Sequence, residues 1–349
     1  MATQAGVTVR DNTLNGSAWN EWATLLNAAI FDADAQQNKY DDLLNALAIV
    51  DNSDRWAEKA TTFGGLGDFE FKAEGADSVN DEAIEGYSKL MEHFTFTKQA
   101  TISKELRDDN QIADAKQKVI NMVQAYKRSR AKYLSQAIVT SVGSTKTMSF
   151  GGKTGIDISA ADTMALFNAA HPLKNCYTTV GTTATQVTQS NLYSNALDTD
   201  PTMLNRLSNI MRNFKDDRGE VLGFDADIIV IPGNQPALER YAKAIIGSDG
   251  EVGSNKNDIN TERGKWKLIV DYLWTPATGS PYILMSSEGL KATMGTRFWN
   301  RTVLDIENEE KVESRNLVYN GFARWSCGFP NWRHVLMGGS SDASATTLS

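Results

Sequence analysis

The chain contains three histidines, His93, His171 and His334, and a catalytic triad would have to use one of them. His171 lies in the stretch LFNAAHPL, where an imidazole more often packs or caps a helix end than acts as a base. The carboxylate pair Asp216-Asp217 and the run Glu307 to Glu310 are typical of a solvated turn and a charged edge. We therefore assign these groups structural roles. An enzyme with an unfamiliar site, using His171 and Asp217, is kept as an alternative.

Two glycine-containing stretches resemble nucleotide-binding motifs without completing them. Gly152-Lys153-Thr154 matches the end of a phosphate-binding loop, but the position of the required first glycine holds Thr147. Gly65-Leu66-Gly67 begins a dinucleotide fingerprint, but the third glycine position holds Glu70. The sequence also lacks the G-x-S-x-G, H-E-x-x-H and paired-cysteine motifs. We expect no catalytic, cofactor-binding or metal-binding residues, and a structural protein rather than an enzyme.

The composition agrees with a large globular protein. The chain has 349 residues, of which 41% are hydrophobic and 22% charged, so it can form two or more lobes with a sizeable core. The net charge is −8 and no block of Lys and Arg stands out, which argues against a dedicated nucleic-acid-binding surface. An acidic protein repels nucleic acid, which suits a container better than a sequence reader.

Cysteine usage and the N-terminal stretch bear on the compartment. Cys176 and Cys327 lie far apart without metal-ligand spacing, so we expect two unpaired thiols in a reducing compartment. The stretch MATQAGVTVRDN has neither a basic region nor an apolar run typical of a signal peptide, and no run is long enough to span a bilayer. We expect a soluble cytoplasmic product.

The elements that would position any site are organised around residues 108–142. This stretch contains no Pro or Gly, and its apolar residues recur at helical spacing, which predicts one helix of about 50 Å. Asp108, Asp109 and Asn110 are expected to cap its start, and Gly143 to follow its end. A helix with one apolar stripe needs a sheet or a partner lying along it.

The segments before this helix contain aromatic residues that need a surface to pack on. A helix is expected from about Ser17, with Trp19 and Trp22 packing either on the chain's own body or on a neighbouring subunit, and a second helix at 40–50. Residues 61–105 contain two stretches in which Phe alternates with polar residues, around an acidic, glycine-rich middle. They predict a hairpin-like excursion of two long strands with a mobile tip, which must lie on something else because it buries little by itself.

The rest of the chain predicts a mixed α/β lobe and late strands. We expect helices from Ser159 or Asp162 to His171, from Pro201, and at 235–246, and a loop or weak hairpin at 175–190. Strands are expected at 227–231, 267–273, 282–285, 289–294, 301–308 and 316–325, a long polar loop at 247–264, and a disordered Ser/Thr tail.

Four stretches, taken in order, point to a known family. They are AADTMALFNAAHPLKN; LNRLSNIMRNFKDDRGEVLGFDADIIVIPGNQPALERYAKAII; NKNDIN followed by KLIVDYLW; and RNLVYNGFARWSCGFPNWRHVLMG. The first resembles the L-F-…-H-P segment of Mu-like major head subunits. The second resembles their helix, turn, buried strand and following helix, and the last their terminal strand that returns beside the long helix. From about Phe63 to Gly338 the chain resembles a tailed-bacteriophage major capsid protein of the Hong Kong 97 fold.

The resemblance implies an α+β Hong Kong 97-type fold. In it, residues 1–60 form the N-terminal arm, 61–105 the extended E-loop, 106–143 the P-domain spine helix, 144–305 the α/β A-domain, 306–338 the P-domain return strands and 339–349 a flexible tail. The chain lacks the long N-terminal coiled-coil scaffolding segment of some relatives, which suggests a separate scaffolding protein or a trimmed chain.

The resemblance also implies a function. The chain would assemble into pentamers and hexamers of an icosahedral or prolate head shell, enclosing double-stranded DNA without sequence-specific binding. The expected partners are further copies of the chain, a scaffolding protein and a portal, and a decoration protein is left open. The expected location is the virion, after assembly in the host bacterial cytoplasm. No membrane partner is expected. The alternatives are an encapsulin-like nanocompartment shell and the enzyme above. The residues expected at contacts between subunits are Trp19, Trp22, Phe63, Phe69, Phe71, Phe94 and Phe96.

Overall fold

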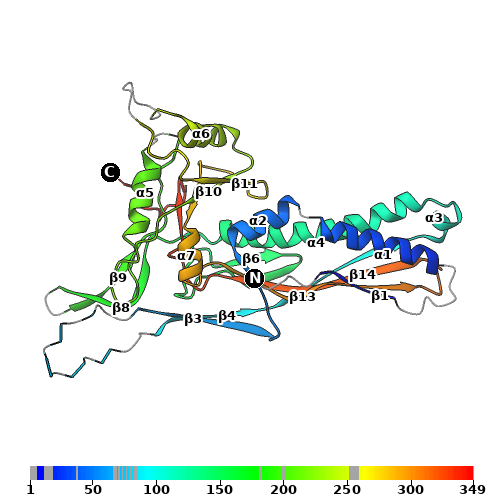
Figure 1. Ribbon diagram of the computed structural model, residues 1–349, viewed down its shortest axis with the longest axis horizontal. Helices are drawn as coiled ribbons and strands as arrows, with labels where there is room; N and C mark the ends of the chain where they lie inside the picture. Colours follow the sequence, from blue (N-terminus) through cyan, green and yellow to red (C-terminus); the bar gives the residue numbers. More distant parts are fainter. Residues whose placement is uncertain are drawn as a thin grey trace. The chain divides into compact units, whose positions relative to one another are not determined.

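The structure is a computed structural model that describes residues 6–11, 19–36, 38–65, 69, 71–72, 74–75, 77–78, 80–81, 85–180, 183–198, 202–250 and 259–348 (Figure 1). Contacts divide the chain into two compact units. Unit 1 consists of Met1–Glu58, Met91–Leu134 and Phe298–Cys327, and unit 2 of Lys59–Leu90, Ser135–Arg297 and Gly328–Ser349. Helices and sheets occur in both units, so the predicted α+β class is confirmed.

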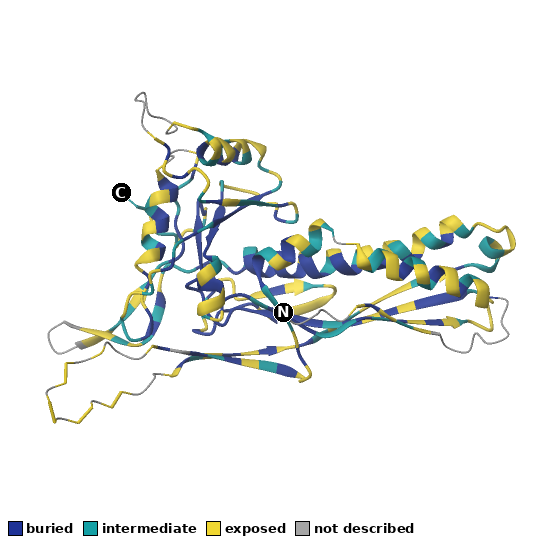
Figure 2. Ribbon diagram, viewed as in Figure 1, coloured by how far each residue is buried: buried dark blue, intermediate teal, exposed yellow. Residues whose placement is uncertain are grey.

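Unit 1 is a five-stranded sheet covered by the long helix α4 (Ile112–Thr140). The strand order is β1 (Thr8–Asp11), β13 (Arg297–Glu310), β14 (Leu317–Gly328) and β5 (Phe94–Ile102), with β2 (Ile49–Asn52) also pairing with β13. β1 runs parallel to β13, and β5 antiparallel to β14. Figure 2 shows the buried side of α4 facing the sheet and its exposed side facing away.

The apolar stripe of α4 packs on this sheet as the spacing predicts. Val119, Val123 and Leu134 are fully buried. On the sheet side, the rings of Phe96 and Trp325 stack with centroids 4.2 Å apart, and the ring of Tyr133 meets Trp325 edge-on at 6.5 Å. Aromatic pairs of this kind add to the free energy that burial of their area already supplies.

The start of the long helix differs from the prediction. A short helix, α3 (Lys104–Asp108), capped by the side chain of Ser103, comes first. Asn110 then adopts a left-handed backbone with φ 54°. Asp108 therefore ends α3, and Asp109 and Asn110 lie in the link to α4 instead of capping one helix. Gly143 has φ +60° and follows α4 as expected.

Two further helices of unit 1 pack beside α4, namely α1 (Asn20–Ala35) and α2 (Lys39–Leu47). The predicted cap Ser17 lies outside the described residues. The ammonium of Lys127 on α4 donates to the carbonyl oxygens of Asp34 and Gln36, both at 2.8 Å, and pairs with Asp41 at 3.1 Å. A cation at the C-terminal end of α1 offsets the partial negative charge of its free carbonyl groups.

Unit 2 contains a four-stranded sheet in the order β11 (Lys267–Asp271), β10 (Ile228–Pro232), β12 (Tyr282–Met285) and β15 (Val335–Gly338). Only the β10–β11 pair is parallel. All five residues of β10 are buried, as its continuous apolar run predicts. The helices α5 (Met203–Arg212), α6 (Pro236–Gly247) and α7 (Ser287–Ala292) lie in this unit, which also includes the last turns of α4 from Ser135.

Unit 2 also contains three two-stranded sheets. They pair β3 (Ala57–Phe63) with β4 (Glu85–Glu92), β6 (Thr147–Phe150) with β7 (Lys153–Asp157), and β8 (His171–Val180) with β9 (Thr183–Gln189). Gly151 and Gly152 have positive φ angles of 58° and 86° in the turn between β6 and β7. The stretch Gly152-Lys153-Thr154 is therefore a hairpin turn and strand, a different context from a phosphate-binding loop.

Three predictions for the later chain are wrong. The stretch from Ser159 to His171 is no helix, because side chains satisfy its backbone: Met164 N–H donates to Asp162, and Leu166 N–H to Ser141 Oγ. Residues 289–294 lie largely in α7, whose start is capped by the side chain of Ser286. The tail is ordered to Leu348, with Thr346 bonding through both its backbone groups to Leu192 and Ser194.

The contacts also place some boundaries differently from the prediction. β5, expected in the excursion, belongs to the sheet of unit 1, while β15, expected beside the spine helix, belongs to the sheet of unit 2. Residues 298–305 cluster with unit 1 instead of the lobe 144–305. Within the described residues, no helix combines the length and the apolar character needed to cross a bilayer.

Candidate assembly surfaces

The strand pair β3–β4 of unit 2 leads into and out of the connecting segment 64–84. Thr62 Oγ1 donates to the carbonyl oxygen of Tyr87 at 3.1 Å, and Lys174 Nζ donates to that of Gly86 at 2.7 Å. A Cβ at Gly86 would lie 2.3 Å from Thr62 Oγ1 and 2.8 Å from a carboxylate oxygen of Asp217. Glycine therefore allows β4 to approach the rest of the unit this closely.

Both ends of the connecting segment are tied to one turn, residues 216–220. Asp216 Oδ1 accepts hydrogen bonds from three backbone N–H groups of the turn, and Asp216 Oδ2 accepts from Gly65 N–H at 3.2 Å. The guanidinium of Arg218 forms an ion pair with Asp81. Asp216 and Asp217 are 8% and 2% exposed, so the predicted solvated turn is wrong: these carboxylates are buried because they organise backbone and cationic partners.

Phe69 and Phe71 lie in this segment with their rings in solvent. Their exposures are 108% and 96%, the largest of any apolar side chain in the described part of the chain. The predicted strand through them is not present at the described positions 69 and 71. Two exposed phenylalanines close together on a segment anchored at both ends are suited to contact another chain.

The other residues expected at subunit contacts divide into two groups. Trp19 is fully buried within unit 1, where its Nε1 donates to Arg315 O and its ring lies 4.7 Å from the guanidinium of Arg107. Of the two alternatives for Trp19, packing on the chain's own body is the one observed. Trp22, Phe94 and Phe96 are half-buried, and Phe96 is stacked on Trp325. The side chain of Phe63 lies outside the described residues.

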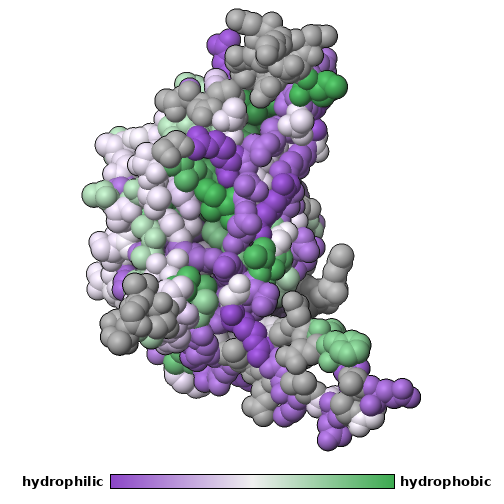
Figure 3. Space-filling model, turned by 90° about the vertical axis from the view of Figure 1, so that its left-hand side faces the viewer, coloured by the Kyte–Doolittle hydropathy of each residue, from purple (hydrophilic) through white to green (hydrophobic). Residues whose placement is uncertain are grey.

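Further exposed apolar side chains escaped the sequence reasoning. They are Trp56 at 67%, Ile259 at 83%, Tyr272 at 64% and Val312 at 90%. A single apolar residue within a polar run, as at Val312, is a weak signal because isolated exposed hydrophobic residues are common. On the face that Figure 3 draws, hydrophobic side chains gather in groups between hydrophilic ones.

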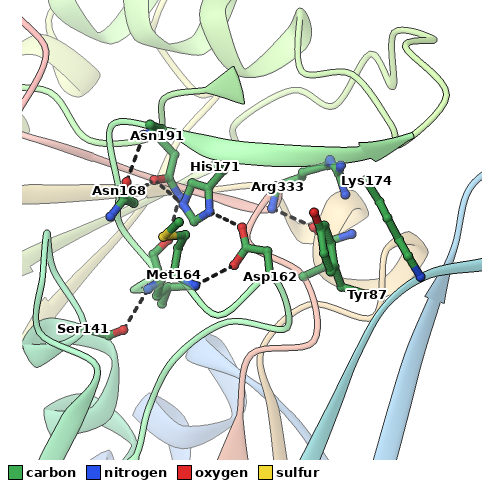
Figure 4. Close-up of polar contacts among 12 residues, drawn as sticks. Tyr87, Ser141, Asp162, Met164, Asn168, His171, Lys174, Asn191 and Arg333 are labelled. Carbon is green, nitrogen blue, oxygen red and sulfur yellow. Dashed lines mark hydrogen bonds and ion pairs between the residues drawn. The ribbon is translucent and has the colours of Figure 1, made fainter. Parts of the chain in front are cut away.

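The histidine of the enzyme alternative, His171, is enclosed in a buried network (Figure 4). Its Nδ1 lies 2.6 Å from a carboxylate oxygen of Asp162, and its Nε2 lies 3.1 Å from Asn191 Oδ1. Asn168 N–H also donates to this amide oxygen, at 2.8 Å, which fixes the orientation of the Asn191 side chain. The ring is 0% exposed and stacks on Trp332 at 4.2 Å. Both ring nitrogens are engaged with oxygen atoms, so neither faces a substrate.

Asp217 takes part in a separate buried ion pair. Its Oδ1 lies 2.7 Å from Nη2 of Arg333, and the same oxygen accepts a hydrogen bond from Lys174 N–H. Arg333 Nε donates to Lys215 O, also at 2.7 Å. Asp217 and His171 thus have different partners, and the structure does not join them in one site. The described residues also contain no group of three or more His, Cys, Asp or Glu arranged to hold a metal ion.

Burial of His334 predicts a pH-dependent stability. His334 Nε2 accepts hydrogen bonds from the N–H and hydroxyl of Thr296, and burial lowers the pKa of His334 to about 3. Between about pH 6.5 and pH 3 only the unfolded chain takes up this proton, so the free energy of unfolding should fall by about 1.4 kcal/mol per pH unit as the pH drops. Urea unfolding of the unassembled chain at pH 7, 6 and 5.5 measures how the free energy of unfolding changes with pH. The variant His334→Gln should lack the part of this change that His334 contributes. Equal slopes for both proteins would contradict the assignment.

Comparisons with known proteins were made by sequence and by structure. No family model and no curated protein match the chain. It is similar to the solved structure "Mycobacterium phage Bobi" at 12% identity and a TM-score of 0.47, over 93% of this chain and 99% of that one. It is similar to "Procapsid of bacteriophage JBD30 computed in I4 symmetry" at 12% identity and a TM-score of 0.45, over 93% of this chain and 76% of that one. It is also similar to "Capsid of empty GTA particle computed with C5 symmetry" at 8% identity and a TM-score of 0.46, over 88% of this chain and 92% of that one. At these identities and TM-scores, function has to be argued from the residues themselves.

Proposed function

We propose that the chain is a structural major capsid protein of the Hong Kong 97 type, which assembles through pentamers and hexamers into a closed shell around double-stranded DNA. The observation that carries the proposal is the connecting segment 64–84, anchored at Gly65 and Asp81 and presenting Phe69 and Phe71 to solvent. A single chain gains nothing from exposing two such rings at an anchored position, whereas a second copy can bury them.

In this proposal the parts of the chain have separate tasks. The β3–β4 pair with its connecting segment is the E-loop, which lies over a neighbouring subunit. The sheet and α4 of unit 1 form the P-domain, and the four-stranded sheet of unit 2 with α5 and α6 forms the A-domain around the symmetry axes. Contacts of this heterologous kind repeat around an axis and close into rings. Each contact can be modest, because many are made at once.

The proposed function also implies partner proteins and a location in the virion. The shell requires many copies of the chain, a separate scaffolding protein and a portal, and it belongs to the virion. The chain then functions by forming a shell that encloses DNA, and this function requires no enzymatic site. The buried positions of His171 and Asp217 support this choice over the enzyme alternative, since both groups are enclosed by the chain itself.

Electron microscopy of the purified chain, alone and co-expressed with a scaffolding protein, tests the proposal. We expect closed shells, rings of five or six, or tubes, and DNA inside heads formed in infected cells. A chain that stays monomeric under both conditions, and whose melting temperature rises with a small-molecule ligand, would instead support an enzyme or binding protein. Shells that hold a protein cargo in place of DNA would support a nanocompartment.

A further inference from the structure

One side of α4 carries a line of cations and amides that faces away from the sheet. Between Ala115 and Thr140 the helix contains no acidic residue. Its exposed residues Lys118, Arg128 and Lys132 follow one another at spacings that place them on the same side of a helix. The α4 stripe is defined as Gln117, Lys118, Asn121, Gln124, Arg128 and Lys132, all of which are exposed.

The cations of the α4 stripe have no carboxylate partner among the residues that the structure describes. Other cations of the same helix do have partners within the chain. Lys127 is 5% exposed and pairs with Asp41, and Arg130 is 4% exposed and lies over the rings of Tyr126 and Phe298 at 5.2 and 5.4 Å. The helix thus uses one set of cations for its own packing and leaves the α4 stripe unpaired. An unpaired set on a chain of net charge −8 is available to an external anion.

The chemistry of the α4 stripe fits a phosphate backbone. Lys and Arg supply charge, and the amides supply further hydrogen-bond donors; Gln117 and Asn121 already bond to each other at 2.8 Å, which holds two of them in place. From Lys118 to Lys132 the stripe extends about 21 Å along the helix, the length of about six base pairs of duplex. Phosphates recur along any duplex whatever its bases, so a contact made to them would be independent of sequence.

We propose that the α4 stripe is the surface of this chain that faces packaged DNA and contacts its phosphates. The inference rests on the proposed capsid function and deepens it, because it fixes which side of unit 1 points to the interior of the shell. Three contacts per subunit would release about three counterions, a weak interaction for one chain that is repeated over every copy in the shell. A protein partner on the same stripe is the competing occupant, and the experiment separates the two.

Lysine footprinting of the same heads before and after removal of DNA tests the inference. Lys118 and Lys132 should be acetylated about five-fold more slowly in filled heads than in emptied heads, because phosphates cover them only in the former. Lys98 and Lys311, exposed cations outside α4, serve as internal references and should react equally in both. Equal reactivity of Lys118 and Lys132 in the two preparations, fast or slow, overturns the inference, and slow reaction in both indicates a protein partner.

A pair of variants gives an independent readout. The variant K118E/R128E/K132E replaces attraction by repulsion and should yield DNA-filled heads at about one tenth of the wild-type level, while empty shells still form. The variant K118R/R128K/K132R keeps every charge and should fill normally. Equal filling by all three proteins contradicts the inference. A wild-type chain that forms no particles at all contradicts the proposed function itself, which is a different result from particles whose α4 stripe is unprotected.

Discussion

Replacing Phe71 by aspartate should give a folded monomer that no longer forms shells. The ring of Phe71 is 96% exposed in the single chain, so its removal costs the monomer nothing in packing. Burying a phenylalanine in a neighbour contributes about 2–3 kcal/mol per contact, and Phe71→Asp both removes this term and places a charge in the contact. In the proposed shell every subunit makes this contact, so the loss would be repeated around each ring and across the shell. Size-exclusion chromatography and electron microscopy measure assembly, and circular dichroism measures folding.

Two matched variants show whether the effect comes from the apolar ring. Phe71→Leu keeps an apolar side chain and should assemble, whereas Phe71→Ser removes the ring without adding charge and should fail like Phe71→Asp. Shells of normal yield from Phe71→Asp would refute the role of this segment. Shells from Phe71→Ser but not from Phe71→Asp would assign the defect to charge repulsion instead of lost apolar contact.

The second large effect is expected in the interior of unit 2. Asp217→Ala leaves the guanidinium of Arg333 buried, 5% exposed, without its carboxylate. Removing one partner of a buried ion pair typically lowers the free energy of unfolding by about 3–5 kcal/mol, because the remaining charge is uncompensated. Urea unfolding measures this change. The Phe71→Asp background is the suitable host, since assembly would otherwise stabilise the folded chain by mass action.

The ion pair between Arg212 and Asp225 provides the control for this experiment. Its side chains are 47% and 43% exposed, and Arg212→Ala should therefore change the free energy of unfolding by less than about 1 kcal/mol. The double variant Asp217→Leu with Arg333→Met should recover much of the loss, because no charge is left buried. A cost for Asp217→Ala no larger than that for Arg212→Ala would show that the buried pair does not stabilise unit 2.

The elements with a strong local pattern could be predicted from the sequence. The apolar stripe of α4, the continuous run of β10 and the strand Tyr282–Met285 all occur where the spacing of apolar residues places them. These patterns are local, because a helix or a buried strand must present its apolar residues with a fixed period whatever it packs against. The absence of any recognised catalytic motif likewise follows from the sequence alone.

The predictions that failed depended on partners far away in the chain. The stretch from Ser159 to His171 has helical spacing, but Ser141 and Asp162 satisfy its backbone in another conformation. Asp217 looked like part of a solvated turn, because its partner Arg333 is remote in sequence. The alternation in β5 correctly predicted a strand but could not tell which sheet it joins, since alternation specifies a buried face and not the neighbour.

The sequence by itself thus determined the α+β class, the long helix, the main buried strands and the resemblance that suggested a capsid protein. Only the tertiary structure decided which aromatic residues remain available to a partner. Trp19 and Phe71 are equally apolar in the sequence, yet one is 0% exposed and the other 96%. The physical reason is that apolar residues are buried by whatever surface reaches them. Arg107 and Arg315 reach Trp19 within unit 1, whereas Phe71 lies on a segment whose anchors hold it away from the chain's own core.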